Sequence, residues 1–391
     1  MVRGVAALAV MLSHVRVLFF VPYAQVLNKN ALVVPAYLMT SLGHEAVLVF
    51  FALSGFFISR SVLNAFQTAR WSWTVFLVNR LTRLLLVLLP GLLLCALWDY
   101  LAMYLPCAAA FYDRTIPGFG ANVVATNSSL GIFVGNLFFL QSIYYPPFGS
   151  NMPLWSLSYE FWYYMLFPTL LIALLGRSRF TKRFTYGVLA VAIILMVGRT
   201  IAILFLVWLT GTAVGLLHDM RSELPPPMSP TWTRRIFGAL GFVALFLVKK
   251  VPVEGLASDF LVAAAFVPVM YCLVGASGSV VHRAYAATAK MLASFSYTLY
   301  LVHLPLLIFL RTLLGNLPRW QPDLKHAAYG VALAALVGAY ALVISRFTEA
   351  RTDAVRRMIF GYRAAQSVFG LSDSTRRKPQ TSRTQAQATD P

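Results

Sequence analysis

Long apolar runs alternate with short polar segments along nearly the whole chain. A helix needs about twenty mostly apolar residues to cross the hydrocarbon core of a bilayer. Runs of roughly that length predict ten membrane-spanning helices, at 2–22, 44–59, 84–104, 156–175, 184–198, 200–217, 236–248, 259–275, 291–313 and 327–345. A further apolar segment at 130–140 is too short to cross, so we expect it to be re-entrant or interfacial. The pattern predicts an all-α, polytopic membrane protein.

Composition agrees with this interpretation. Of the 391 residues, 59% are hydrophobic and 12% are charged, whereas about 25% are charged in an average soluble domain. The first apolar run, residues 1–21, has polar residues at mid-length and no small-residue cleavage site, so we expect a retained helix and not a signal peptide. The three cysteines show neither paired spacing nor a metal-ligand pattern, and we predict no metal site.

Positive charge is unevenly distributed over the predicted loops. The chain has 32 Lys and Arg against 13 Asp and Glu, a net charge of +19 that would suggest nucleic-acid binding in a soluble protein. If the N-terminus is cytoplasmic, 23 of these basic residues fall on the inner side and eight on the outer side. Cytoplasmic loops of membrane proteins carry this excess. We therefore expect both termini in the cytoplasm, no nucleic-acid partner, a membrane domain at 1–350 and a basic, mostly disordered tail at 351–391.

The first predicted helix carries Arg3, His14 and Arg16 among apolar residues. Ionisable groups at membrane depth are costly unless they face protein or water, so they mark candidate functional positions. Arg3 and His14 are eleven residues apart, which places them on one helix face about 16 Å apart. An imidazole accepts a proton near neutral pH. His14 is therefore either a catalytic base or a packing histidine that bonds a neighbouring helix.

Arg80 and Arg83 lie three residues apart at the inner end of the third predicted span, so they are neighbours on one helix face. They either mark the cytoplasmic side or, together with Arg3, clamp the phosphates of a cytoplasmic ligand such as coenzyme A. Glu160 lies about one turn into the next span among aromatic residues. It is either a structural ion-pair partner or a catalytic carboxylate.

Two further polar residues lie near the end of the membrane domain. His303 is in the middle of an aromatic helix, and we expect a core histidine with satisfied hydrogen bonds. Glu349 lies at the inner end of the last span, with Arg346 and Arg351 nearby. A surface ion-pair network or an acidic catalytic group would both fit that position.

Together these residues form five sequence blocks that resemble the acyltransferase-3 family of integral-membrane acyltransferases. The blocks, in family order, are R-G-x-A-A-x-x-V-x-x-x-H at 3–14, G-H-E-A-V-x-V-F-F-x-L-S-G-F-x-I at 43–58, F-x-x-x-R-x-x-R at 76–83, W-S-L-S-x-E-x-x-Y at 155–163 and S-x-S-Y-x-x-Y-L-x-H-x-P at 294–305. The similarity covers the chain to about residue 350. It is specific for the family but not for a substrate.

The resemblance implies transfer of an acyl group, usually acetyl from acetyl-CoA, to a hydroxyl of a glycan or related acceptor at the cell envelope. By this resemblance, His14 matches the essential first-helix histidine of the family and Arg3 matches the arginine before it. Arg80 and Arg83 match the paired arginines, and Glu160 and Glu349 match acidic positions. The chain departs from the family twice. Ala350 and Arg351 replace the usual proline after Glu349, and only two residues precede Arg3, so either the assigned start is late or Arg3 is unusually exposed.

We therefore expect a bacterial inner-membrane O-acyltransferase with acyl-CoA as its donor and no permanently bound cofactor. The arginines would hold the donor phosphates. His14, oriented by Glu160 or Glu349, would act as the base or carry the acyl group itself. A protein that exports a glycan or lipid-linked sugar without acyl transfer, or a non-catalytic membrane partner of polysaccharide assembly, would have similar buried polar residues.

Overall fold

The computed structural model describes residues 1–105, 121–176, 179–222, 230–248, 251–275, 283–315 and 317–360. In these ranges the chain is helical and contains no β-strand, which confirms the all-α prediction. The α-helices are α1 (Val2–Phe19), α2 (Val33–Thr40), α3 (Gly43–Gln67), α4 (Trp73–Met103), α6 (Ala121–Thr126), α7 (Leu130–Leu137), α8 (Trp155–Leu175), α9 (Phe180–Ser222), α10 (Pro230–Val248), α11 (Leu256–Gly275), α12 (Arg283–Leu313), α13 (Leu324–Phe347) and α14 (Thr352–Phe360). Short 3₁₀ helices lie at η1 (Tyr23–Gln25), η2 (Met152–Leu154) and η3 (Glu349–Arg351).

Seven of the described helices are long and apolar enough to cross a membrane, namely α1, α3, α4, α9, α11, α12 and α13. Helices also lie at the other predicted spans, α8 at 156–175 and α10 at 236–248. The predicted pair 184–198 and 200–217 forms α9, which is interrupted at Gly198, where φ is 80°. The chain is thus a multi-pass membrane protein. The number of ten crossings and the cytoplasmic termini stay predictions.

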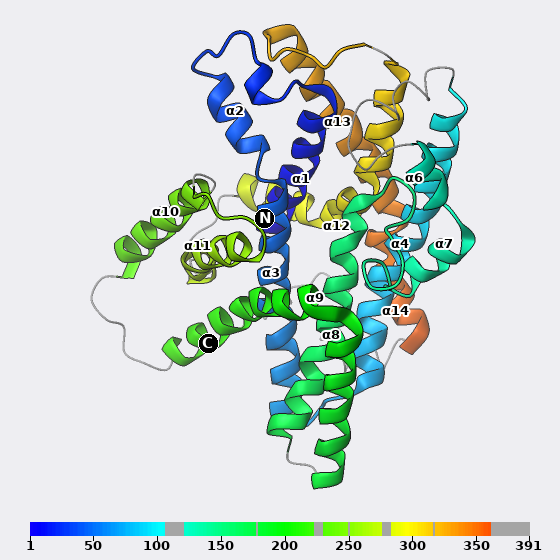
Figure 1. The fold of residues 1–391 in the computed structure, drawn as a ribbon. Coiled ribbons are helices and arrows are strands. Elements are labelled where there is room, and N and C mark those ends of the chain that lie inside the picture. Colours follow the sequence, from blue (N-terminus) through cyan, green and yellow to red (C-terminus); the bar gives the residue numbers. More distant parts are fainter. Residues whose placement is uncertain are drawn as a thin grey trace, which may run out of the picture.

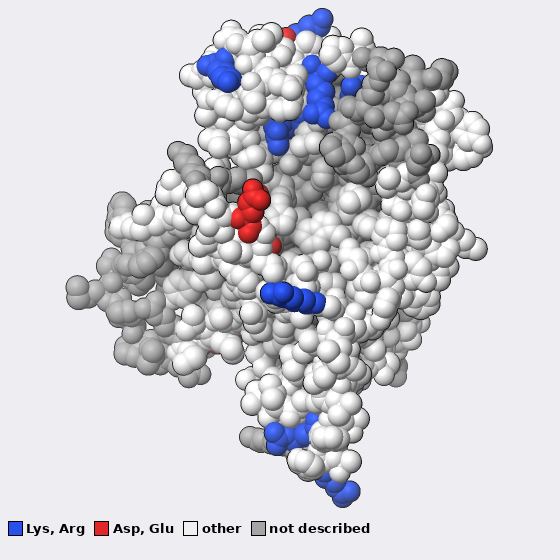
Figure 2. Space-filling model, viewed as in Figure 1, with Lys and Arg blue, Asp and Glu red and all other residues white. Residues whose placement is uncertain are grey.

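The centre of the molecule is built around α1, α3 and α12 (Figure 1). Helix α1 packs against both α3 and α12, α3 packs along α9, and α4 and α13 flank α12. The contact between α3 and α9 is very close, because a Cβ atom at Gly55 would lie 1.9 Å from the carbonyl oxygen of Trp208. Figure 2 shows that uncharged atoms cover most of the middle of one face, with Lys and Arg mainly toward its two ends.

Basic side chains connect the C-terminal end of α1 to the helices around it. Arg311 of α12 is 4% exposed, and its guanidinium donates to the backbone oxygens of Leu18, Gly315 and Leu317. Arg16 lies over the ring of a tyrosine in α2, 5.6 Å from the ring centroid. Buried carbonyl partners compensate the cost of placing a guanidinium inside an apolar protein.

The shorter segments are held against the central helices. Helix α7 has eight residues, which is too short to cross a bilayer, as expected for 130–140. The loop that follows is fixed by Asp99 of α4, which accepts hydrogen bonds from the backbone N of Ser150 at 2.8 Å and from its Oγ at 2.5 Å. At the other end of the chain α14 packs on α4. The rest of the predicted basic tail, 361–391, lies outside the described residues.

Candidate active site

A pair of histidines joins α1 to α12 in the interior. Nδ1 of His14 lies 2.9 Å from Nε2 of His303, and their ring centroids are 5.0 Å apart. His303 is fully buried, as the sequence led us to expect. Its partner could not have been predicted, because the two residues are 289 positions apart and no motif connects them. The candidate catalytic imidazole is therefore positioned by a second imidazole.

The hydrogen bonds indicate which nitrogen of His14 is free to react when both rings are neutral. Nδ1 of His303 lies 2.9 Å from the carbonyl oxygen of Leu299, which can only accept, so this nitrogen carries the proton. Nε2 of His303 then accepts a hydrogen bond, and Nδ1 of His14 must donate it. This assignment, inferred from the bonding partners, leaves Nε2 of His14 with its lone pair. That atom can take a proton or attack an electrophilic carbon.

The three arginines singled out from the sequence line a single cavity of about 730 Å³. Arg3 comes from the start of α1, and Arg80 and Arg83 come from α4. The rest of the lining is largely apolar and comes mostly from α3, α11 and α12, although Arg60 and His218 also belong to it. The cavity thus combines guanidinium groups with apolar walls, as suits a ligand with an anionic end and an uncharged chain.

Glu160 lies in the same cavity at the end of a chain of hydrogen bonds. Nε1 of Trp208 donates to Oγ of Ser54 at 3.3 Å, and Ser54 Oγ lies 3.1 Å from the hydroxyl of Tyr164. The Tyr164 hydroxyl in turn donates to Oε1 of Glu160. Arg80 also lies over the ring of Tyr164, with its Cζ 6.0 Å from the centroid. Glu160 is therefore part of the arginine cavity.

Glu349 is anchored at the same end of the site. One carboxylate oxygen accepts from the backbone N and from Oγ1 of Thr298, at 3.2 and 3.1 Å, and the other lies 4.0 Å from Nη2 of Arg83. Its ion-pair partner among the described residues is thus Arg83, and not Arg346 or Arg351 as the surface-network interpretation supposed. Glu349 therefore lies with the arginine group of the site.

The structure therefore separates the predicted site residues into two groups. Among the described residues His14 bonds to His303, and neither Glu160 nor Glu349 forms a hydrogen bond with it. Arg3 and His14, which belong to different groups, are about 16 Å apart along α1. Tyr300 lies between them on α12, with its ring centroid 6.1 Å from that of His303 and its hydroxyl 2.7 Å from Oγ of Ser156. The catalytic roles of the two carboxylates stay predictions.

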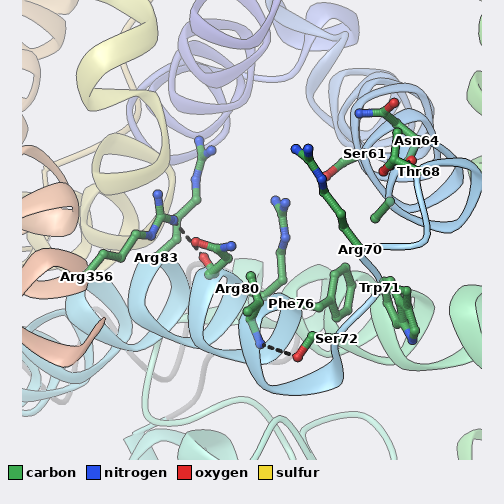
Figure 3. Close-up of a pocket in the computed structure, with 13 residues that line it drawn as sticks. Ser61, Asn64, Thr68, Arg70, Trp71, Ser72, Phe76, Arg80, Arg83 and Arg356 are labelled. Atoms are coloured by element: carbon green, nitrogen blue, oxygen red, sulfur yellow. Dashed lines mark hydrogen bonds between the residues drawn. The ribbon is translucent and has the colours of Figure 1, made fainter. Parts of the chain in front are cut away.

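A second cavity adjoins the first, and the two share Arg80 and Arg83. Its volume is about 780 Å³, and Arg70 and Arg356 also line it (Figure 3). In Figure 3 the side chains of Arg70, Arg80 and Arg83 extend in one direction, into the space between α4 and α3. In the part of the chain that the structure describes, no group of three or more His, Cys, Asp or Glu residues is placed to hold a metal ion.

Fold and site together define a multi-pass membrane protein with an arginine-lined cavity and, farther along α1, a pair of histidines that joins α1 to α12. A family model described as an acyltransferase domain, that of the acyltransferase-3 family, matches residues 1–346. The chain belongs to this family, and it is a membrane acyltransferase. No curated protein and no solved structure matches it.

Proposed function

We propose that the protein transfers an acyl group, acetyl in the simplest case, from acyl-CoA to a hydroxyl of a glycan or lipid-linked sugar at the bacterial inner membrane. The observation that carries this proposal is that Arg3, Arg80 and Arg83, from two separate sequence blocks, line one cavity. Guanidinium groups recognise phosphates through paired, charge-assisted hydrogen bonds. Acyl-CoA is an acyl donor that carries phosphates at the end remote from its reactive thioester.

The separation between the arginines and His14 suits such an elongated donor. With its phosphates at the arginines, the pantetheine arm extends along α1 and α12 toward His14, about 16 Å away. The apolar part of the cavity lining, including Leu53, Phe56 and Leu84, favours the uncharged arm over water. The thioester carbonyl then reaches the histidine pair while the nucleotide stays at the other end of the site.

The chemistry follows from the free Nε2 of His14. The acceptor hydroxyl oxygen attacks the thioester carbon as His14 Nε2 takes its proton, and the C–S bond breaks. The CoA thiolate then receives this proton from the imidazolium, so the products are an ester and free CoA. His303 accepts a hydrogen bond from His14 Nδ1 throughout, which holds the ring in place. An acyl-histidine relay uses the same nitrogen, first as nucleophile toward the thioester and then as leaving group.

Acyl transfer from labelled donor tests the proposal directly. Membranes that contain the wild-type chain or His14→Ala are supplied with radiolabelled acetyl-CoA and separated into lipid, glycan and protein pools. We expect label in the glycan or lipid-linked pool with the wild type and a loss of at least about a hundredfold with His14→Ala, since general bases contribute roughly 10²- to 10⁴-fold. If well-expressed wild-type protein transfers no label from acetyl-CoA or succinyl-CoA, the proposal is wrong, and export of an unmodified glycan becomes the better hypothesis.

A further inference from the structure

The second cavity is a distinct polar compartment beside the proposed donor site. It is formed by the end of α3, the connecting residues 68–72, the start of α4 and one arginine of α14. Arg80 and Arg83 line both cavities. A ligand whose phosphates bind these two residues can therefore extend one of its ends into the first cavity and the other end into the second. Figure 3 shows Arg83 and Arg356 at one side of this second cavity and Phe76 and Trp71 at the other, with Arg80 between them.

The second cavity is strongly cationic. Its described lining contains four arginines and no acidic side chain. Two of these arginines have acidic partners that do not line the cavity. Nη1 of Arg356 lies 3.1 Å from Oδ1 of Asp353, and Nη2 of Arg83 lies 4.0 Å from Oε1 of Glu349. No ion pair within the described residues involves Arg70 or Arg80. A ligand in this cavity must therefore bring negative charge, and there is more positive charge than one phosphate requires.

The same cavity has the aromatic and amide groups that recognise a purine. Trp71 lines it and stacks on Phe66, with ring centroids 4.7 Å apart and an interplanar angle of 19°. The side chains of Asn64 and Asn79 also line it, and Oδ1 of Asn79 is buried without a hydrogen-bond partner. Bases stack on aromatic side chains and hydrogen-bond to amides through their donor and acceptor edges.

We propose that this second cavity binds the 3′-phosphorylated adenosine end of the acyl-CoA donor. The diphosphate lies at the shared Arg80 and Arg83, the 3′-phosphate is held by Arg70, and the base packs beside Trp71. The pantetheine arm then leaves through the first cavity toward the histidine pair. This assignment rests on the proposed function, and it gives binding roles to Arg70 and Trp71, which no sequence block marked.

Binding of adenosine 3′,5′-bisphosphate tests the assignment without any acyl transfer. Calorimetric titration of the purified full-length protein should show binding, and Arg70→Gln should weaken it about tenfold, as expected for the loss of one charge-assisted hydrogen bond. Arg70 is exposed, so this change removes charge without disturbing packing. The matched control is Arg346→Gln, because Arg346 is an exposed arginine that lines neither cavity. It should bind like the wild type.

Two donors extend the test to the reaction. Acetyl-CoA should have a KM at least about tenfold below that of S-acetyl-4′-phosphopantetheine, which lacks the nucleotide. Arg70→Gln should raise the KM of acetyl-CoA only. Equal KM values for the two donors, or wild-type-like bisphosphate binding by Arg70→Gln, would overturn the assignment. Acetyl transfer without bisphosphate binding would refute this inference alone, whereas bisphosphate binding without acetyl transfer would refute the proposed function and leave the cavity as a nucleotide-binding site without a donor role.

Discussion

At the scale of single side chains, we expect His303 to position His14 for catalysis, and replacing His303 tests that role. His303→Leu removes the acceptor of the His14 Nδ1 hydrogen bond while keeping an apolar side chain of similar size. We expect kcat to fall roughly ten- to a hundredfold, less than removal of a general base itself, and the KM for acetyl-CoA to stay nearly constant. Steady-state kinetics in detergent would measure both parameters.

The control for this prediction is His303→Gln. Its side-chain oxygen can still accept a hydrogen bond, so it should retain more activity than His303→Leu. If both variants lose activity equally, or if KM changes as much as kcat, His303 has a packing role and not a positioning one.

Arg80 is expected to act through phosphate binding. Arg80→Gln should raise the KM for acetyl-CoA about tenfold or more and change kcat much less, because the contact is made in both the bound donor and the transition state. Arg80→Lys keeps the charge but loses the paired geometry of the guanidinium, so its KM should lie between those of the wild type and Arg80→Gln. Initial rates at varied donor concentration distinguish these outcomes. A wild-type KM in Arg80→Gln would contradict the donor site.

These residues also show what the sequence could predict about the site. Arg3, Arg80 and Arg83 were expected to act together because the charge distribution placed all three on one side of the membrane, and the structure brings them to one cavity. The pairing of His14 with His303 depends on how α1 and α12 pack, which hydropathy does not encode. We also expected Glu160 or Glu349 beside the imidazole. The sequence carries no packing information, so it could not show that both carboxylates lie near the arginines.

At the scale of helices, the positions of the elements followed from hydropathy but their contacts did not. Each predicted span overlaps a described helix, two of them sharing α9, since burying apolar side chains and satisfying backbone hydrogen bonds in lipid leaves few alternatives. The close contact of α3 with α9 depends on which glycines face each other. That contact can be tested by adding a single methyl group.

Gly55→Ala should destabilise the protein, because the new Cβ would lie 1.9 Å from the backbone oxygen of Trp208, which cannot move independently of α9. Overpacking of this kind costs about 1–3 kcal/mol. The matched control is Gly187→Ala in α9, where no atom other than the neighbouring backbone of the same helix lies within 4 Å of the added Cβ and alanine is the better helix former. Melting of purified protein in detergent should show a lower transition for Gly55→Ala alone. Equal melting temperatures would mean that the two helices can separate without cost.

At the scale of the whole molecule, orientation connects the fold to the chemistry. Residues 1–3 line the arginine cavity, so we expect its ligand to enter from the side of the membrane that holds the N-terminus. Acyl-CoA is a cytoplasmic metabolite. The proposed function therefore requires a cytoplasmic N-terminus, which the excess of basic residues on the inner side independently predicts.

Labelling of single introduced cysteines tests this orientation in a background that lacks Cys95, Cys107 and Cys272. Lys182 and Glu254 are both exposed, and the predicted topology places them on the inner and outer sides. We expect a membrane-impermeant maleimide to label Glu254→Cys in intact cells and Lys182→Cys only after permeabilisation. The reverse pattern would place the arginine cavity outside the cell, where no acyl-CoA can reach it. The donor assignment would then fail even though the histidine pair and the cavity geometry remained the same.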